Sequence, residues 1–226
     1  MKRLSPLLIM LVLAACSVTK EQPLADVQKA PRSGFLSDYS LLRPGKEGQA
    51  ALRYINPKAN WSSYTSIYVT PVEFIGDAKS QADPQQEQIL CSYYYDALRK
   101  QLATVLPIAN RPGPNVMVIR AALTNVTTAT PGLRTVSVVI PQDRLLNAAQ
   151  SLATDSYAFV GSAQSEGEIT DGGTGMVLAQ AVDGREGGMS IKNADVWEWG
   201  DAEHAMDYWA QLAATRLKEF RSGSTS

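Results

Sequence analysis

The sequence is short of the residues on which most metal sites and nucleophilic enzymes depend. Its 226 residues include one histidine, His204, and two cysteines, Cys16 and Cys91. One histidine excludes the usual multi-histidine zinc sites, and two cysteines cannot build a four-cysteine structural site. A Ser-His-Asp or Cys-His relay would have to use His204, but no Gly-x-Ser-x-Gly elbow accompanies it. We therefore expect no metal and no cofactor, and we interpret His204 as a surface or helix-capping residue.

The sequence also lacks an excess of positive charge. Its formal net charge is -1, and a chain beginning at Cys16 would lose Lys2 and Arg3, leaving 19 basic against 22 acidic residues. Nucleic-acid binding needs a clustered positive field, so nucleic acid is excluded as a partner. No polybasic run is present to hold the body of the protein on anionic lipid. The content of 45% hydrophobic residues is that of a packed globular protein rather than a disordered one.

No long hydrophobic run occurs at the N-terminus, although a short one does. The uncharged stretch from Leu7 to Ala15 follows Met1-Lys2-Arg3, and it is about half the ~20 residues that a membrane-spanning helix needs. A positive start and a short apolar stretch that ends in small residues are typical of an export signal. Leu13-Ala14-Ala15-Cys16 resembles the lipobox of bacterial lipoproteins. In that family the cysteine thiol receives a diacylglyceryl group, the signal is cut before the cysteine, and the new amine is acylated. The alternative is an ordinary secretory signal in which Cys16 lies near the cleavage site by chance.

Lipidation of Cys16 would fix the location of the protein. Acyl chains contribute ~0.8 kcal/mol per buried CH₂, so more than one chain gives stable anchoring. Ser17 follows the cysteine, and it differs from the Asp that resembles an inner-membrane retention signal. We therefore expect an outer-membrane protein that faces the periplasm. The predicted organisation is a signal peptide over 1–15, a lipidated N-terminus and flexible tether over 16–33, one domain over 34–220 and a disordered tail over 221–226.

Hydrophobic periodicity predicts an α+β fold. An ordered arm over 34–45 precedes a strand over 64–74, in which Pro71 marks an edge, a bulge or an end. The remaining predicted elements are a helix from Asp83 to Pro107, strands over 115–128 and 133–140, a helix from Pro141, a strand over 157–170, its hairpin partner over 176–182 and a helix over 201–220. Because hairpins dominate this order, we expect a mainly antiparallel sheet with helices packed on one face.

Two glycine-rich stretches and the second cysteine are further candidate sites. Asp171-Gly172-Gly173-Thr174-Gly175 lies between two strands and no lysine follows it, which favours a hairpin turn over a phosphate loop. The stretch over 184–188 similarly indicates a flexible loop. Cys91 is interpreted as a buried thiol that acts as a small hydrophobe, and intermolecular pairing is the alternative.

Acidic and aromatic pairs supply the remaining candidates. Gln164, Glu166 and Glu168 alternate along one strand, so we expect them on a solvated sheet face. Asp195 and Glu198 form a second acidic pair, and either pair is the basis of a hydrolase alternative, although a glycosidase places its carboxyls across a cleft. Trp197 and Trp199 either present a partner or glycan surface or pack the helix entry onto the core.

Four stretches together carry a resemblance to a known family. They are SGFLSDYSLLRPG at 33–45, RYINPKANWSSYTSIYVTPVEF at 53–74, LCSYYYDALRKQL at 90–102 and EITDGGTGMVLAQAVDGREGG at 168–188. With them the chain resembles a family of bacterial lipoproteins designated domain of unknown function 3313. The resemblance supplies no catalytic residues.

Taken together, these features predict a lipid-anchored envelope protein with a non-enzymatic binding or assembly-accessory domain. We expect it to contact the membrane through its N-terminal lipid and to bind an envelope protein or cell-wall material. An envelope hydrolase or a glycan-binding lipoprotein is the alternative.

Overall fold

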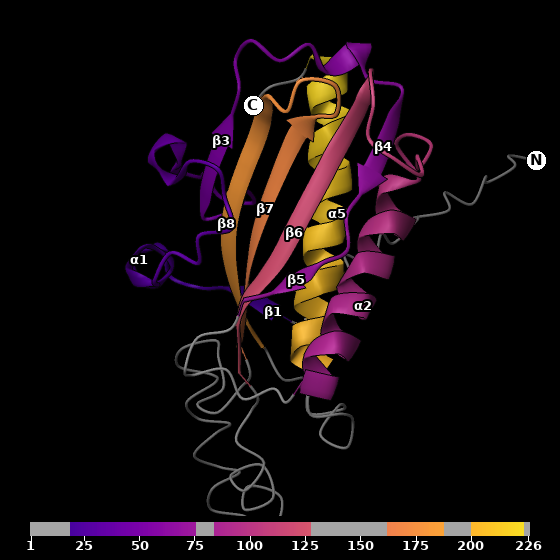
Figure 1. Ribbon diagram of the computed structural model, residues 1–226. Coiled ribbons are helices and arrows are strands. Elements are labelled where there is room, and N and C mark those ends of the chain that lie inside the picture. Colours follow the sequence, from indigo (N-terminus) through magenta and orange to yellow (C-terminus); the bar gives the residue numbers. More distant parts are fainter. Residues whose placement is uncertain (1–18, 76–83, 128–161, 188–199, 224–226) are drawn as a thin grey trace, which may run out of the picture.

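The computed structural model describes residues 19–75, 84–127, 162–187 and 200–223 (Figure 1). These residues form one eight-stranded sheet and three helices. The strands are β1 (Thr19–Glu21), β2 (Arg43–Pro44), β3 (Leu52–Ile55), β4 (Ser66–Val69), β5 (Glu73–Phe74), β6 (Val116–Thr127), β7 (Ser162–Asp171) and β8 (Val177–Gly187). The helices are α1 (Leu24–Lys29), α2 (Pro84–Leu102) and α5 (Gly200–Ser222), with 3-10 turns at Tyr39–Leu41 and Trp61–Ser63.

The sheet is mixed, which corrects the prediction of a mainly antiparallel sheet. Its strand order is β2-β3-β8-β7-β6-β4, while β1 also pairs with β8 and β5 with β6. The β4 and β5 strands run parallel to β6, and the other pairs are antiparallel. Parallel neighbours need a long crossover connection, and the segment that contains α2 provides it. The α+β class is confirmed.

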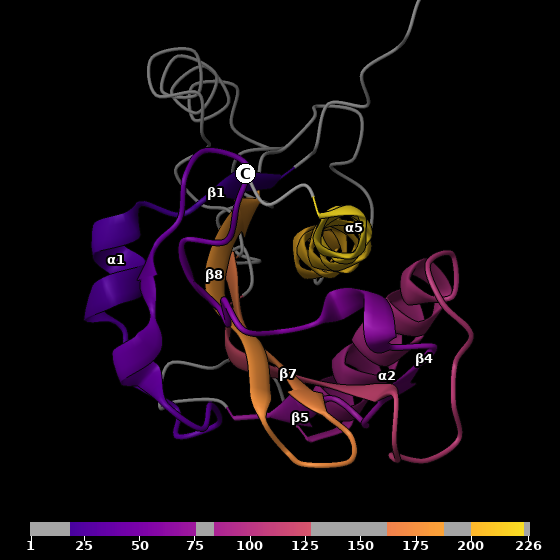
Figure 2. The ribbon, with the colours of Figure 1, turned by 90° about the horizontal axis from the view of Figure 1, so that it is seen from above.

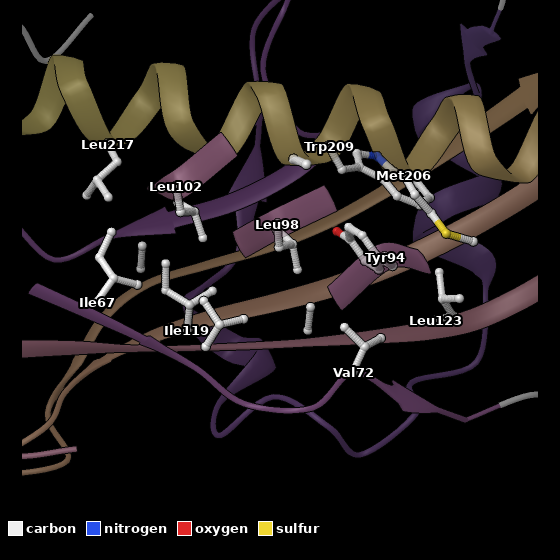
Figure 3. Close-up of a cluster of buried hydrophobic side chains, with 14 of the residues drawn as sticks. Ile67, Val72, Tyr94, Leu98, Leu102, Ile119, Leu123, Met206, Trp209 and Leu217 are labelled. Atoms are coloured by element: carbon white, nitrogen blue, oxygen red, sulfur yellow. The ribbon is translucent and has the colours of Figure 1, made fainter. Parts of the chain in front are cut away.

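The main core lies between the sheet and the two long helices. Figure 2 shows α2 and α5 on the same side of the sheet, and Figure 3 shows their side chains meeting those of the strands. On α2 the apolar residues recur every four positions, which places them on one face. The fully or nearly buried members include Ile67, Leu90, Tyr94, Leu98, Leu102, Ile119, Leu123, Met206, Trp209 and Leu217.

The opposite face of the sheet is also covered, so the prediction that helices pack on one face only is wrong. In Figure 2 α1 lies across the sheet from α5. A second cluster of buried residues joins α1 and the segment after it to this face, comprising Val27, Phe35, Leu36, Ala51, Ala122 and Val182. The expected ordered arm is therefore confirmed, because Phe35 and Leu36 are each only 5% exposed.

The flexible tether predicted over 16–33 does not agree with the structure from Thr19 onward. The β1 strand pairs with the end of β8 that β3 leaves open, and the Thr19 carbonyl accepts a hydrogen bond from Arg185 Nη2 at 2.6 Å. Free backbone groups on an edge strand are a ready template for such pairing. The disordered tail predicted over 221–226 is likewise wrong at its start, because α5 continues through Ser222. Arg221 Nη1 donates hydrogen bonds to the carbonyls of Trp61 and Tyr64.

The other predicted elements mostly coincide with observed ones. The strand over 64–74 is β4 followed by β5, and Pro71 lies between them as the rule for proline in strands requires. The helix expected up to Pro107 ends earlier, at Leu102. The strands over 115–128, 157–170 and 176–182 correspond to β6, β7 and β8. The expected strand over 133–140 and the helix from Pro141 lie outside the described residues.

Candidate functional site

Glu166 and Glu168 lie on β7, on the sheet face that α1 covers. The prediction that this face is solvated is wrong, because Glu166 is only 3% exposed and Glu168 only 2% exposed. Ser33 and the arm that follows it (34–45) cover them. Burying a carboxylate is costly unless it is paired and hydrogen-bonded, so its partners decide what each glutamate can do.

Glu166 holds the start of the arm. Its Oε2 accepts hydrogen bonds from Tyr39 Oη at 2.5 Å and from Ser33 Oγ at 2.9 Å. Tyr39 Oη in turn accepts from the backbone N–H groups of Gly34 at 3.1 Å and Leu36 at 3.4 Å. Burial, together with the hydrogen bond to Glu166, raises the pKa of Tyr39. One phenol therefore connects the arm's own backbone to the sheet.

Glu168 is compensated by an arginine. Its Oε2 accepts from the Ser37 N–H at 2.9 Å and from Gln180 Nε2 at 2.7 Å. Its Oε1 lies 3.3 Å from Arg120 Nη1, on the neighbouring β6. The Arg120 guanidinium also lies 4.5 Å from the centroid of the Phe35 ring. The Glu168 carboxylate therefore interacts with the arm through Ser37, with the Gln180 amide and with the positive charge of Arg120.

A polar pocket of about 200 Å³ adjoins Glu166, between α1, the arm and the sheet. Gln164, Arg32 and Tyr39 line it. A glycosidase needs two carboxyls facing each other across a cleft. Glu166 and Glu168 instead project from the same strand two positions apart, and the arm's donors occupy the space above them. This geometry favours anchoring of the arm over acid–base chemistry by this pair.

The described cysteine and histidine lie apart from this cluster. Cys91 is 7% exposed, and burial, with a smaller contribution from Glu87, raises its pKa to about 11. The interpretation of Cys91 as a buried thiol is confirmed. His204 is half-buried on α5, and its Nδ1 has no hydrogen-bond partner among the described residues. In that part of the chain no three His, Cys, Asp or Glu residues gather as a metal ion would require.

The glycine-rich stretches have structural roles. Asp171 Oδ1 accepts hydrogen bonds from the N–H groups of Gly173 and Thr174 and from Thr174 Oγ1. Gly175 has φ 75°, so this segment is the predicted hairpin turn. The loop predicted over 184–188 is wrong up to Gly187, because those residues belong to β8. Gly184 permits the side chain of Gln22 to pack on the strand, since a Cβ there would lie 2.1 Å from Gln22 Oε1.

Several predicted site residues lie outside the described residues. Cys16, Asp195, Trp197, Glu198 and Trp199 all belong to this group. Among the described residues, no helix is long and apolar enough to cross a bilayer.

Sequence reasoning missed the residues that compensate the buried acids. Arg120 could have been noticed, because it is the one charge in the apolar stretch VMVIRAAL of β6. Tyr39 and Ser33 carry no comparable signal. A third buried acid, Asp183, was also missed: it is 4% exposed and accepts from Trp209 Nε1 at 2.7 Å and from the Ala51 N–H at 2.9 Å.

Known proteins resemble this chain in sequence. The uncharacterized lipoprotein YdcL of Escherichia coli K12 is 27% identical over 182 residues, covering 79% of this chain and 78% of that protein, and the O157:H7 protein of the same name matches equally.

The similarity to solved structures is weaker. The PelC dodecamer from Paraburkholderia phytofirmans is 12% identical with a TM-score of 0.40, covering 71% of this chain and 95% of that one. A DUF4136 family protein from Bacteroides thetaiotaomicron is 14% identical with a TM-score of 0.33, covering 74% of this chain and 95% of that one. Both scores are below 0.5.

The family comparison covers most of the fold described above. The family described as "Protein of unknown function (DUF3313)" matches residues 31–213, from the arm to the middle of α5. This protein belongs to the DUF3313 family.

Proposed function

We propose that the protein is a lipid-anchored envelope protein whose folded domain binds a partner without catalysing a reaction. The observation that carries this proposal is the sequence Leu13-Ala14-Ala15-Cys16 behind a short export signal. A relative over most of the chain is itself named a lipoprotein, which supports the same conclusion. Ser17 after the cysteine favours the periplasmic face of the outer membrane.

Cys91 is poorly accessible to a modifying enzyme. Cys91 lies on α2 in the main core, with its pKa raised to about 11 chiefly by burial. The thiolate is the reactive form of cysteine, so a buried thiol with a raised pKa is a poor acceptor. This supports Cys16 as the lipidated residue.

The described domain supports binding over catalysis. The carboxylates of Glu166 and Glu168, which underlie the hydrolase alternative, are occupied by donors from the arm, Gln180 and Arg120. An envelope protein or cell-wall material is the proposed partner.

Metabolic labelling with a palmitate analogue tests the anchor. Wild type and C91S should incorporate the label and sediment with outer membranes on a density gradient. C16S should remain unlabelled and be absent from the outer-membrane fraction, because it has no thiol to receive the lipid. C91S is the matched control because it removes the other thiol. Label on C16S, or its sedimentation with outer membranes, would contradict lipidation at Cys16.

Substitution of Ser17 tests the choice of membrane separately. S17D should move the labelled protein from the outer-membrane to the inner-membrane fraction. A wild-type protein that already sediments with inner membranes would refute the outer-membrane location without affecting lipidation.

Incubation with purified peptidoglycan tests the hydrolase alternative. The purified protein should release no soluble fragments, and E166Q should behave like wild type. Release of fragments by wild type that E166Q abolishes would overturn the non-enzymatic proposal.

In-cell crosslinking of the wild-type protein tests partner binding, and it should yield a discrete envelope partner.

A further inference from the structure

A second cavity lies on the other side of the sheet, between the sheet and α5, with a volume of about 160 Å³. It is separate from the polar pocket beside Glu166. Its walls are apolar and include Ile55, Leu98, Ile119, Ile169, Leu212 and Phe220. A comparable cavity of about 150 Å³ with aliphatic and aromatic walls stays dry and binds benzene. The space under α5 therefore suits a hydrocarbon group of about six carbon atoms.

The cavity exists because the sheet has small residues beneath α5. Ala121, Gly167 and Ala181 are direct neighbours on β6, β7 and β8, and all three line the cavity. A Cβ at Gly167 would meet no heavy atom nearer than the Arg120 carbonyl oxygen, at 3.9 Å. A larger side chain would therefore fit there, and glycine leaves the space open.

Two arginines lie at the rim of this cavity. The row of small residues ends at Arg53, the β3 neighbour of Ala181, and Arg216 of α5 lines the same space. Both residues are half-buried. Arg216 donates to Glu219 Oε2 and to the Gly48 carbonyl, each at 2.7 Å, while its buried Nε has no hydrogen-bond partner in the described part of the chain.

The Arg53 guanidinium makes no hydrogen bond or ion pair with any described residue. Burial, and then the nearby charge of Arg216, lower its pKa. Glu219 offsets one of the two positive charges, so the rim keeps an excess of one. The buried Asp183 also lines the cavity, but the nearby charge of Arg185 offsets its own, and its two oxygens already accept from Trp209 and Ala51. The rim is therefore suited to an anion above an apolar space.

We propose that this cavity binds an amphiphile with an anionic head, placing its hydrocarbon tail between α5 and the sheet and its carboxylate or phosphate on Arg53. The free Nε of Arg216 provides a second donor for the head. This site goes beyond the proposed function, since it depends on neither lipidation of Cys16 nor the arm. Fatty acids and phospholipid fragments are the two sources of such chemistry.

Calorimetric titration of the processed full-length protein in lipid nanodiscs tests the site, with empty nanodiscs as the blank. The probes are octanoate, octyl phosphate, octanol and octylammonium. The two anions should bind saturably. Octanol should bind at least about tenfold more weakly, because it lacks the charged hydrogen bond, which contributes that much affinity. Octylammonium should bind most weakly of the four probes. Tighter binding of octanoate indicates a fatty acid as the natural ligand, and tighter binding of octyl phosphate indicates a phospholipid.

Chain length tests the apolar part. From butanoate to hexanoate the affinity should rise about fourfold per methylene, because each buried CH₂ contributes a constant increment. The rise should level off once about six carbons fill the cavity. A series with no dependence on chain length would overturn the proposal.

Three variants locate the site. R53Q should weaken octanoate binding about tenfold or more and leave octanol unchanged, whereas R53K should keep most of the affinity. G167V should abolish binding of both, because its side chain occupies the cavity. R111Q, which removes an exposed arginine outside the cavity lining, is the control and should bind like wild type.

The outcomes separate clearly. Absence of saturable binding by every probe, equal affinities for octanoate and octylammonium, or equal effects of R53Q and R111Q would each refute the proposal. Unchanged binding by a folded G167V would also refute it. Since the Arg53 guanidinium has no hydrogen bond or ion pair with any described residue to lose, R53Q stays informative even if G167V does not fold.

Discussion

The Tyr39 hydroxyl is the group on which attachment of the arm depends most. It donates to the buried Glu166 carboxylate at 2.5 Å and accepts from two backbone N–H groups of the arm. Y39F removes this oxygen and leaves the aromatic ring, so packing against the sheet is retained. We therefore expect Y39F to report the hydrogen bonds alone.

The size of the effect follows from the partners. A hydrogen bond to a charged group contributes about 1.5–3 kcal/mol. Glu166 keeps its bond from Ser33 Oγ at 2.9 Å, and the Gly34 N–H is exposed enough for water to replace the lost acceptor. We expect Y39F to lower the free energy of unfolding by about 2 kcal/mol, within the range for a lost charged hydrogen bond.

Urea denaturation of Y39F, E166Q and the double variant measures this directly. Y68F is the matched control, because Tyr68 is also half-buried and its hydroxyl has no hydrogen bond among the described residues. Y68F should change stability by less than about 0.5 kcal/mol, and the Y39F and E166Q changes should couple by about 1–2 kcal/mol. Equal stability of Y39F and Y68F, or no coupling, would show that the carboxylate does not hold the arm.

Three other predictions concern buried or hydrogen-bonded groups outside the arm. Because burial raises the Cys91 pKa to about 11, its thiol in a C16S background should react with a maleimide at pH 8 about 100-fold more slowly when folded than in urea; similar rates would contradict its burial. D171A removes the acceptor of three hydrogen bonds in the β7–β8 turn and should cost about 1–2 kcal/mol; an unchanged Tm would contradict this. Burial raises the pKa of Asp183 above 3.8, partly opposed by the hydrogen bond from Trp209. The folded state therefore binds this proton more tightly than the unfolded state, so its contribution is present at low pH and lost as pH rises through the folded-state pKa. Unfolding free energies of wild type should fall relative to D183N over that range, and parallel pH profiles would refute the reasoning.

The long elements could be predicted because their side-chain periods are strong. The four-residue spacing of Leu90, Tyr94, Leu98 and Leu102 identifies the buried face of α2 whatever the topology. The alternation along β7 separates two faces correctly, with Ala163 and Ile169 on the helix side. Alternation does not predict which segment of the chain packs on each face of the sheet. The acids of β7 were expected in solvent because nothing in their own strand reveals the arm that covers them.

The pairing of distant strands was the other limit. Adjacent predicted strands suggest hairpins, but β4 and β5 pair in parallel with β6 across the α2 crossover. The segment Thr19–Lys29 has no hydrophobic period, since Val27 is its one buried apolar anchor. This segment is ordered because β1 pairs with the free edge of β8 and Val27 packs on the sheet. Both the edge and the sheet face belong to the rest of the fold, so the segment's own residues do not reveal them.

The candidate site was predictable only in part. The sequence identified Glu166 and Glu168 as a notable pair but predicted that they face solvent, whereas the structure buries both and gives them protein partners. Nothing in the sequence marks Arg53 or Gly167 as a site residue, because an isolated arginine and a strand glycine are common. Their significance comes from register alone, since Gly167 and Arg53 both neighbour Ala181 on β8.

If Cys16 carries lipid, the position of β1 limits how far the domain can move from a membrane. Thr19, already paired with Gly187, lies three residues after Cys16, and three extended residues span at most about 11 Å. With lipid on Cys16, the β1 corner would rest within the headgroup layer, and the domain could pivot there but not rise into the periplasmic space. A partner would then have to approach parallel to the bilayer or from above, and lateral diffusion in the leaflet would set how often the two meet.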